Sequence, residues 1–141
     1  MILDLDGYLG VHASALKLHE RRTELLATNL ANADTPGYKA RDLDFRSAMA
    51  AATGPAASAG QQVTHHTGQG AAGGLNASEL NAGSTEAFIK YRTPLAPSLD
   101  GNTVDAQLEQ SAFAENAVRY QATLTLLGTQ LRSLMTAITG Q

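Results

Sequence analysis

The sequence predicts a mainly α-helical fold in which long N- and C-terminal helices pair as a coiled-coil-like hairpin, with a short extended piece and a flexible Gly/Ala-rich middle. Apolar residues near both ends of the chain recur at alternating steps of three and four, which is typical of helices with a narrow apolar seam. The stretch between them has little to bury, so its ordering cost is not met. We therefore expect residues 1–52 and 86–141 to pack as one domain, separated by a flexible segment at 53–85.

The first helix is expected from about Leu5 to Asn32, because one seam runs along that whole stretch. The members of this seam are Leu5, Leu9, His12, Leu16, His19, Thr23, Leu26 and Leu30. Pro36 disfavours helical backbone at Thr35, so the helix must end near Ala33. The seam needs a second element to cover it, and the seam at the other end of the chain is the obvious candidate.

A tight turn and a short helix are expected next. Thr35-Pro36-Gly37-Tyr38 fits a type II turn, in which Pro36 takes the second position and Gly37 supplies a positive φ at the third. Residues 42–52 then have the pattern of a short helix. Its apolar contacts should come from Leu43, Phe45 and Met49.

The middle of the chain differs in kind from its ends. Residues 53–85 are dominated by Gly, Ala, Ser, Thr, Gln and Asn, which predicts a flexible or disordered segment. Glu86–Arg92 is expected to be extended, and the prolines at positions 94 and 97 stop it. Asn102 is expected to be the N-cap of the long C-terminal helix, with Asp105 near the positive end of that helix.

The C-terminal helix carries the longer and more apolar seam. Its members are Phe113, Ala117, Tyr120, Leu124, Leu127, Leu131, Leu134 and Ile138. From residue 117 onward the only charged side chains are Arg119 and Arg132, which is fewer than a helix facing water usually carries. Two interpretations stay open on this pattern alone: a helix that meets partners on more than one face, or a core helix of an ordinary small bundle.

The composition argues against several classes of protein. A net charge of −3 in 141 residues gives no reason to expect nucleic-acid binding. The absence of Cys removes disulfides and thiolate chemistry. No apolar run is long enough to span a membrane, and the first residues lack the basic and apolar regions of a cleavable secretory signal. We therefore expect neither a membrane span nor such a signal.

No catalytic residue, cofactor site or metal site is expected. His65 and His66 are adjacent in a polar stretch but have no carboxylate nearby, which makes a weak metal signal. His12 and His19 share a helix face but are two turns apart, so they cannot chelate one ion alone. No phosphate-binding Gly loop or nucleophile motif is present in the sequence. These observations argue against an enzyme.

One block of the sequence resembles a motif of the bacterial flagellar basal-body rod and hook proteins, of the form NLANxxTPGYK. The residues that match the turn of this motif are Asn29, Asn32, Thr35, Pro36, Gly37 and Tyr38. Residues 40–45, 91–94, 97–105 and 115–121 look like the proximal rod members of that family. Residues 63–67 depart from it, because a Thr-His-Pro segment found in many relatives lacks its Pro here.

The resemblance implies a structural subunit of the proximal rod of the flagellar basal body. Such a subunit is exported by the flagellar type III export apparatus and polymerises in the periplasm. It links the MS ring to the distal rod, transmits torque and lines the export channel. The implied partners are other copies of itself, other rod proteins, the MS-ring protein and the small adaptor FliE, with no nucleic acid and no direct membrane insertion.

In that family the terminal helices pair and pack against neighbouring subunits, so the resemblance implies that the seams form the assembly interface. The interface residues expected on this basis are Leu9, Leu16, Leu26, Leu30, Phe113, Tyr120, Leu124, Leu127, Leu131, Leu134 and Ile138. Two alternatives remain: another rod paralogue of the same family, and a soluble helical adaptor unrelated to flagella.

Overall fold

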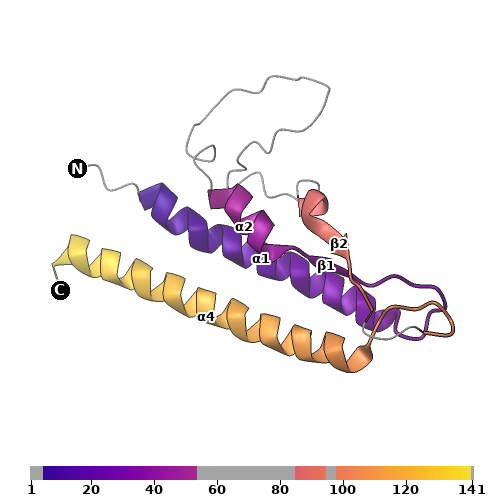
Figure 1. The fold of residues 1–141 in the computed structure, drawn as a ribbon. Helices are drawn as coiled ribbons and strands as arrows, with labels where there is room; N and C mark the ends of the chain where they lie inside the picture. The colour runs from indigo at the N-terminus through magenta and orange to yellow at the C-terminus, as the bar shows by residue number, and fades with distance from the viewer. Residues whose placement is uncertain (1–4, 54–84, 95–97, 141) are drawn as a thin grey trace, which may run out of the picture.

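The computed structural model describes residues 5–53, 85–94 and 98–140 (Figure 1). In chain order the elements are helix α1 (Leu5–Ala31), strand β1 (Arg41–Leu43), helix α2 (Phe45–Thr53), the 3-10 turn η1 (Glu86–Phe88), strand β2 (Ile89–Tyr91) and helix α4 (Ala106–Thr139). The predicted mainly helical fold with two long paired terminal helices is confirmed. The expected flexible segment and the His65-His66 pair lie outside the described residues.

Helix α1 forms the middle layer of the molecule. Helix α4 runs antiparallel along one side of α1, while α2 and the two-stranded sheet lie on the other side (Figure 1). The strands pair antiparallel, with Arg41 opposite Tyr91 and Leu43 opposite Ile89. Because α1 is covered from two sides, the positions that bury its side chains extend around much of its circumference.

The hydrophobic core lies between α1 and the layer of α2 and the strands. Its buried members are Leu18, Leu25, Leu43, Ala48 and Ala52, and the partly buried Phe45, Met49, Phe88 and Ile89 pack around them. All of these residues come from α1 or from the segments on the side of α1 that faces away from α4. The core therefore holds the short elements onto α1 and leaves α4 outside it.

The turn after α1 forms as the sequence predicts. Gly37 has a φ of 73°, and the amide of Tyr38 donates to the carbonyl of Thr35 at 3.3 Å. The positive φ explains why a glycine stands at this position. The turn is also bound to the loop before α4, since the amide of Gly37 donates to the carbonyl of Asp100 at 2.9 Å.

The prediction that Asn102 is the N-cap of the long helix is wrong. Asp105 caps α4, because its carboxylate accepts from the amides of Gln107 and Leu108. Asn102 is buried instead against the C-terminal end of α1, where its side-chain amide donates to the carbonyls of Asn32 (3.0 Å) and Ala33 (2.7 Å). It thus satisfies carbonyls that the end of α1 leaves without helical partners. An Asn can cap either end of a helix, and only the tertiary structure decides which.

The short helix also begins later than expected. Residues 41–43 are strand β1, and α2 starts only at Phe45. The Asp44 carboxylate accepts from the amide of Ser47 at 3.1 Å, which is the geometry of an N-cap. The expectation failed because pairing with β2, a contact distant in sequence, overrides the local helical pattern of these residues.

Candidate assembly interface

Helix α4 buries very little of itself. Of its 34 residues only two are buried, and both are polar: Glu109 is 1% exposed and Asn116 is 0% exposed. They lie seven residues apart and therefore on one face of the helix. This face, which we call the inner row, continues through half-buried side chains toward α1 and consists of Glu109, Ala112, Asn116, Thr123 and Gln130.

A row of exposed apolar residues runs beside the inner row. This outer row consists of Phe113, Ala117, Leu124, Leu131 and Ile138. The exposed fraction of the four large side chains ranges from 37% at Leu124 to 83% at Ile138. Further apolar side chains are exposed elsewhere on α4, at Leu108, Val118, Leu126 and Met135. An apolar surface of this extent on one helix marks an interaction site.

The seam expected on α4 is therefore divided between two directions. Tyr120, Leu127 and Leu134 are half-buried, whereas the large members of the outer row are exposed. On α1 the seam does face α4, since His12, His19 and Thr23 all form hydrogen bonds with α4 side chains. Of its other members, Leu26 is fully buried, and Leu9, Leu16 and Leu30 are half-buried.

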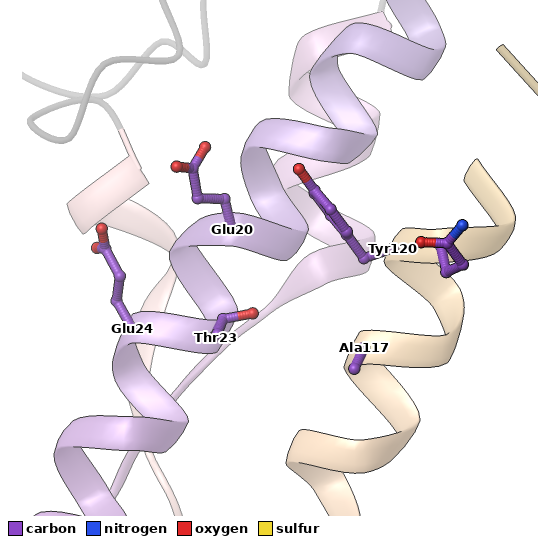
Figure 2. A pocket seen from close by; sticks show the side chains of 6 residues that line it. Glu20, Thr23, Glu24, Ala117 and Tyr120 are labelled. Carbon is purple, nitrogen blue, oxygen red and sulfur yellow. The ribbon is translucent and has the colours of Figure 1, made fainter. Parts of the chain in front are cut away.

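A shallow groove opens between the two helices on the side of the outer row. It has a volume of about 490 Å³ and is lined by Glu20, Thr23, Glu24, Ala117, Tyr120 and Gln121. Figure 2 shows Tyr120 reaching from α4 toward α1, with Glu20 and Glu24 along the α1 side. The groove thus places two carboxylates beside an apolar strip that belongs to α4.

Asn116 binds α1 through three hydrogen bonds. Its side-chain oxygen lies 2.7 Å from Nδ1 of His19, and its amide donates to the carbonyl of His19 at 2.8 Å and to Oγ1 of Thr23 at 2.9 Å. Because an amide oxygen only accepts, Nδ1 of His19 must carry the proton. The buried Asn116 side chain is therefore fully engaged by one turn of α1.

Glu109 binds a second polar cluster, where α1, the strands and α4 meet. Its carboxylate accepts from Nδ2 of Asn29 at 3.1 Å and from Nη1 of Arg92 at 2.6 Å. Arg92 also donates to Asp42 at 2.6 Å, and Arg22 donates to the same carboxylate through Nε and Nη2. Two cations and two anions thus balance one another in a partly buried chain of ion pairs.

The charges of this cluster shift the acidity of Asp42. Burial raises the pKa of the Asp42 carboxyl, but the hydrogen bonds from Arg22 and Arg92 and the charge of Arg22 oppose burial and leave the pKa below its usual value of 3.8. At the sheet edge, Lys90 and Ser47 lower the pKa of the half-buried Asp44 to about 2. Both carboxylates are therefore held in their charged form at neutral pH.

The residues of the turn motif (residues 29–38) lie where the end of α1, strand β1 and the start of α4 meet, and not on the outer surface of α4. Asn29 is fully buried and bonds to the backbone of Arg41 twice, through Nδ2 to the carbonyl (2.7 Å) and through Oδ1 from the amide (3.0 Å). The side chain of Asn32 donates to the carbonyl of Thr28 and accepts from the hydroxyl of Thr35. These residues fix how the chain leaves α1, with Pro36, Gly37 and Tyr38 completing the turn.

Sequence reasoning missed Glu109 and Asn116. The signal was present, because the inner row repeats at the same heptad spacing as the apolar seam, one position earlier. A search for apolar residues passes over this row, because four of its five members are polar. Glu109 and Asn116 are buried there only because α1 and Arg92 supply hydrogen-bond partners.

Neither a metal centre nor a membrane span emerges from the part of the chain that the structure describes. Within residues 5–53, 85–94 and 98–140, no three His, Asp or Glu side chains gather in a way that would hold a metal ion. In those same ranges no helix combines the length and the hydropathy needed to cross a bilayer.

Comparison with known proteins finds relatives in one protein family. A family model described as "Flagella basal body rod protein" matches residues 9–39. A protein of Cereibacter sphaeroides named "Flagellar basal body rod protein FlgB" is 49% identical over 133 residues, which is 94% of each chain. Proteins of the same name from Salmonella typhimurium and Aeromonas hydrophila are 40% and 34% identical, and the matches span 99% of both chains in the first case and 100% of this chain in the second.

Proposed function

The chain belongs to the family of flagellar basal body rod proteins, and from that premise we propose that the outer row of α4 is the surface through which it joins neighbouring rod subunits. The chain is a structural subunit of the flagellar basal body, of the FlgB type, and not an enzyme. A different rod paralogue is not favoured, because relatives that match nearly the whole chain carry the FlgB name.

The observation that carries this proposal is the mismatch between the apolar character of α4 and its burial. Four large apolar side chains of the outer row are at least 37% exposed in the isolated chain. Burying what remains exposed would contribute roughly 0.5–1.5 kcal/mol for each of Phe113, Leu124 and Leu131, and about 1–2.5 kcal/mol for Ile138. A subunit that leaves apolar surface exposed to water on its own can bury that surface against neighbouring subunits, and the outer row is a surface of this kind.

The proposed surface includes the expected interface residues that the structure leaves accessible. These are Phe113, Leu124, Leu131 and Ile138, with the half-buried Leu9, Leu16, Leu30, Tyr120, Leu127 and Leu134 beside them. Leu26 is fully buried within the molecule, so we assign it to the helix pair and not to the contact with neighbours.

The proposed place of the subunit is the proximal rod in the periplasm. Its partners there are other copies of itself, other rod proteins, the MS-ring protein and the adaptor FliE, after export by the flagellar type III apparatus. Transmission of torque, a link from MS ring to distal rod and a lining for the export channel belong to the same proposal. Family membership and the resemblance of the motif blocks support it.

A complementation experiment tests the proposed surface. A strain lacking the gene receives either the wild-type chain or the variant Leu124→Asp/Leu131→Asp, and purified basal bodies are probed for the subunit. The matched control is Thr129→Asp/Ser133→Asp, which adds the same charges at exposed positions of α4 away from the outer row. We expect the control to restore rods and swimming and the outer-row variant to restore neither. Equal incorporation of both variants would refute the assignment of the outer row.

A further inference from the structure

We propose that Glu109 and Asn116 are positioning residues that hold α4 in one rotational setting, with the outer row turned away from α1. Polar contacts, and not the largest apolar side chains, decide which face of α4 meets α1. The consequence for assembly rests on the function proposed above, whereas the rotational setting itself is a property of the isolated chain.

The two rows of α4 compete for the same partner. The outer row follows the inner row by one residue at Phe113, Ala117, Leu124 and Leu131. One residue corresponds to about 100° around a helix, so a rotation of that size would exchange the rows. The exchange would place Phe113, Leu124 and Leu131 against the seam of α1, which contains Leu9, Leu16 and Leu26. The rotation would turn the half-buried Tyr120, Leu127 and Leu134 away from α1 in exchange, so apolar contact alone does not select the observed arrangement.

Partners on α1 oppose that rotation. His19, itself 6% exposed, and Thr23 are bound by Asn116 at 2.7 and 2.9 Å. In the rotated arrangement the methyl group of Ala117 would replace the Asn116 amide, and the buried imidazole would lose its acceptor. A buried polar group without a partner weighs heavily against any arrangement.

Glu109 opposes the rotation at a second point, two turns away. Its carboxylate is fully buried between Asn29 and Arg92. Rotation would take this carboxylate away from Asn29 and from the Arg92 guanidinium, whose other partner is Asp42, and the buried charge of Glu109 would lose its compensation. Two contacts on one face, separated along the axis, fix the rotation of α4 and its axial position together. Single buried polar residues are known to fix the register of paired helices in this way.

The consequence for assembly is that the apolar row stays available. If α4 turned its outer row onto α1, Phe113, Leu124 and Leu131 would be buried within the subunit and could no longer contact its neighbours. The polar contacts therefore exclude a closed arrangement that would compete with the rod. This assigns a physical reason to polar residues in the middle of an otherwise favourable apolar helix pair.

Cross-linking of engineered cysteines reads the rotational setting directly, because the natural chain has no Cys. The inward reporter pair is His12→Cys with Gln130→Cys, whose natural side chains approach to 3.1 Å. The outward reporter pair is His12→Cys with Leu131→Cys. We expect rapid disulfide formation in the inward pair and little in the outward pair of the otherwise natural chain.

The same reporters are then combined with Asn116→Leu, and with the triple change Asn116→Leu/His19→Leu/Thr23→Val, which removes every polar side chain of that contact. We expect helix content to persist while the outward pair cross-links several-fold faster than before. Thr125→Leu, a polar-to-apolar change at an exposed position of α4 outside the groove, should leave both rates as they are. In cells, Asn116→Leu should reduce swimming and incorporation into basal bodies, and Thr125→Leu should not.

Unchanged cross-linking in both Asn116 variants would overturn the proposal, because α4 would then keep its setting without the contact. Loss of helix content in the triple variant would also overturn it, since replacement of all the partners by apolar groups should be tolerated. A shifted cross-link with normal swimming would overturn the link to assembly. Failure of the wild-type gene to restore rods would instead reject the function proposed above and leave the cross-linking result standing.

Discussion

Nδ2 of Asn29 donates to Oε2 of Glu109 at 3.1 Å, and this contact joins the end of α1 to the start of α4. The same Asn29 side chain binds both backbone polar groups of Arg41, so one buried amide connects three segments of the chain. Asn29 is also the first residue of the family motif. Its place in the structure gives a physical reason for an Asn there: an amide supplies donors and an acceptor at once, which no apolar side chain of that size can do.

Replacing Asn29 should therefore destabilise the isolated chain strongly. Asn29→Ala leaves the amide and carbonyl of Arg41 and one oxygen of Glu109 without this partner, so we expect a loss of about 2–3 kcal/mol in the free energy of unfolding. Chemical denaturation followed by circular dichroism measures it. Asn32→Ala is the matched control, because Asn32 lies in the same motif and its side-chain bonds are solvent-exposed. A similar loss from both substitutions would contradict a special role for the buried amide.

Two glycines should respond in opposite directions to the same substitution. Gly37→Ala forces a side chain into a φ of 73° and should cost about 1–2 kcal/mol of stability. Gly128 lies inside α4, and a Cβ built there meets no atom within 4 Å. Gly128→Ala should therefore raise stability by about 0.5–1 kcal/mol through better helix propensity. Thermal unfolding of the two variants measures this contrast, and a change of both midpoint temperatures in the same direction would refute it.

The ion-pair cluster should make the chain sensitive to acid. The pKa of Asp42 is lower in the folded state than its usual value of 3.8, so between those two values the unfolded state binds more protons than the folded state. Stability contributed by Asp42 is thus present above about pH 4 and is lost as the pH falls through the folded pKa. Asp44, whose pKa is lowered to about 2 by Lys90 and Ser47, adds a loss of stability of the same sign.

Denaturation midpoints measured from neutral to acidic pH test this account. Asp42→Asn should be less stable than the natural chain at neutral pH, and the difference between the two should narrow as the pH falls below about 4. Asp34→Asn is the control, since Asp34 is exposed and no ion pair involves it in the part of the chain described. A constant difference between Asp42→Asn and the natural chain over the whole range would show that its charge is not the cause.

Local signals in the sequence were sufficient where local chemistry decides the structure. Pro36 and Gly37 specify the turn through their own backbone preferences, and the apolar spacing of α1 specifies which face of α1 meets α4. The strand at residues 41–43 and the role of Asn102 depend on segments about 50 to 70 residues away. No local pattern contains those contacts, so propensity alone assigns the wrong structure there.

The direction of α4 was the least predictable feature. An apolar seam is expected to face its partner helix, yet Glu109 and Asn116 occupy that position while the outer row is exposed. Only part of the apolar seam of α4, the outer row, thus forms a surface for neighbouring molecules under the proposed function. A single chain considered alone has no means of telling an inward seam from an outward one unless the polar partners on the opposing helix are also considered.

Leu127 and Leu131 provide the sharpest test of this division, because they are one turn apart on the same expected seam but differ in burial. Leu127 is half-buried beside α1, so Leu127→Asp should destabilise the isolated chain by about 2–3 kcal/mol as well as block assembly. Leu131 is 46% exposed, so Leu131→Asp should change the stability of the isolated chain by no more than about 0.5 kcal/mol and still block assembly.

Urea denaturation of the purified variants measures the stability of the isolated chain, and purified basal bodies probed for the subunit measure incorporation. Ser133→Asp, which introduces the same charge at an exposed position away from the outer row, controls for the effect of an added carboxylate. Equal destabilisation by the changes at 127 and 131 would mean that both side chains pack within the molecule. The outer row would then be part of the hairpin, and assembly would have to use another surface.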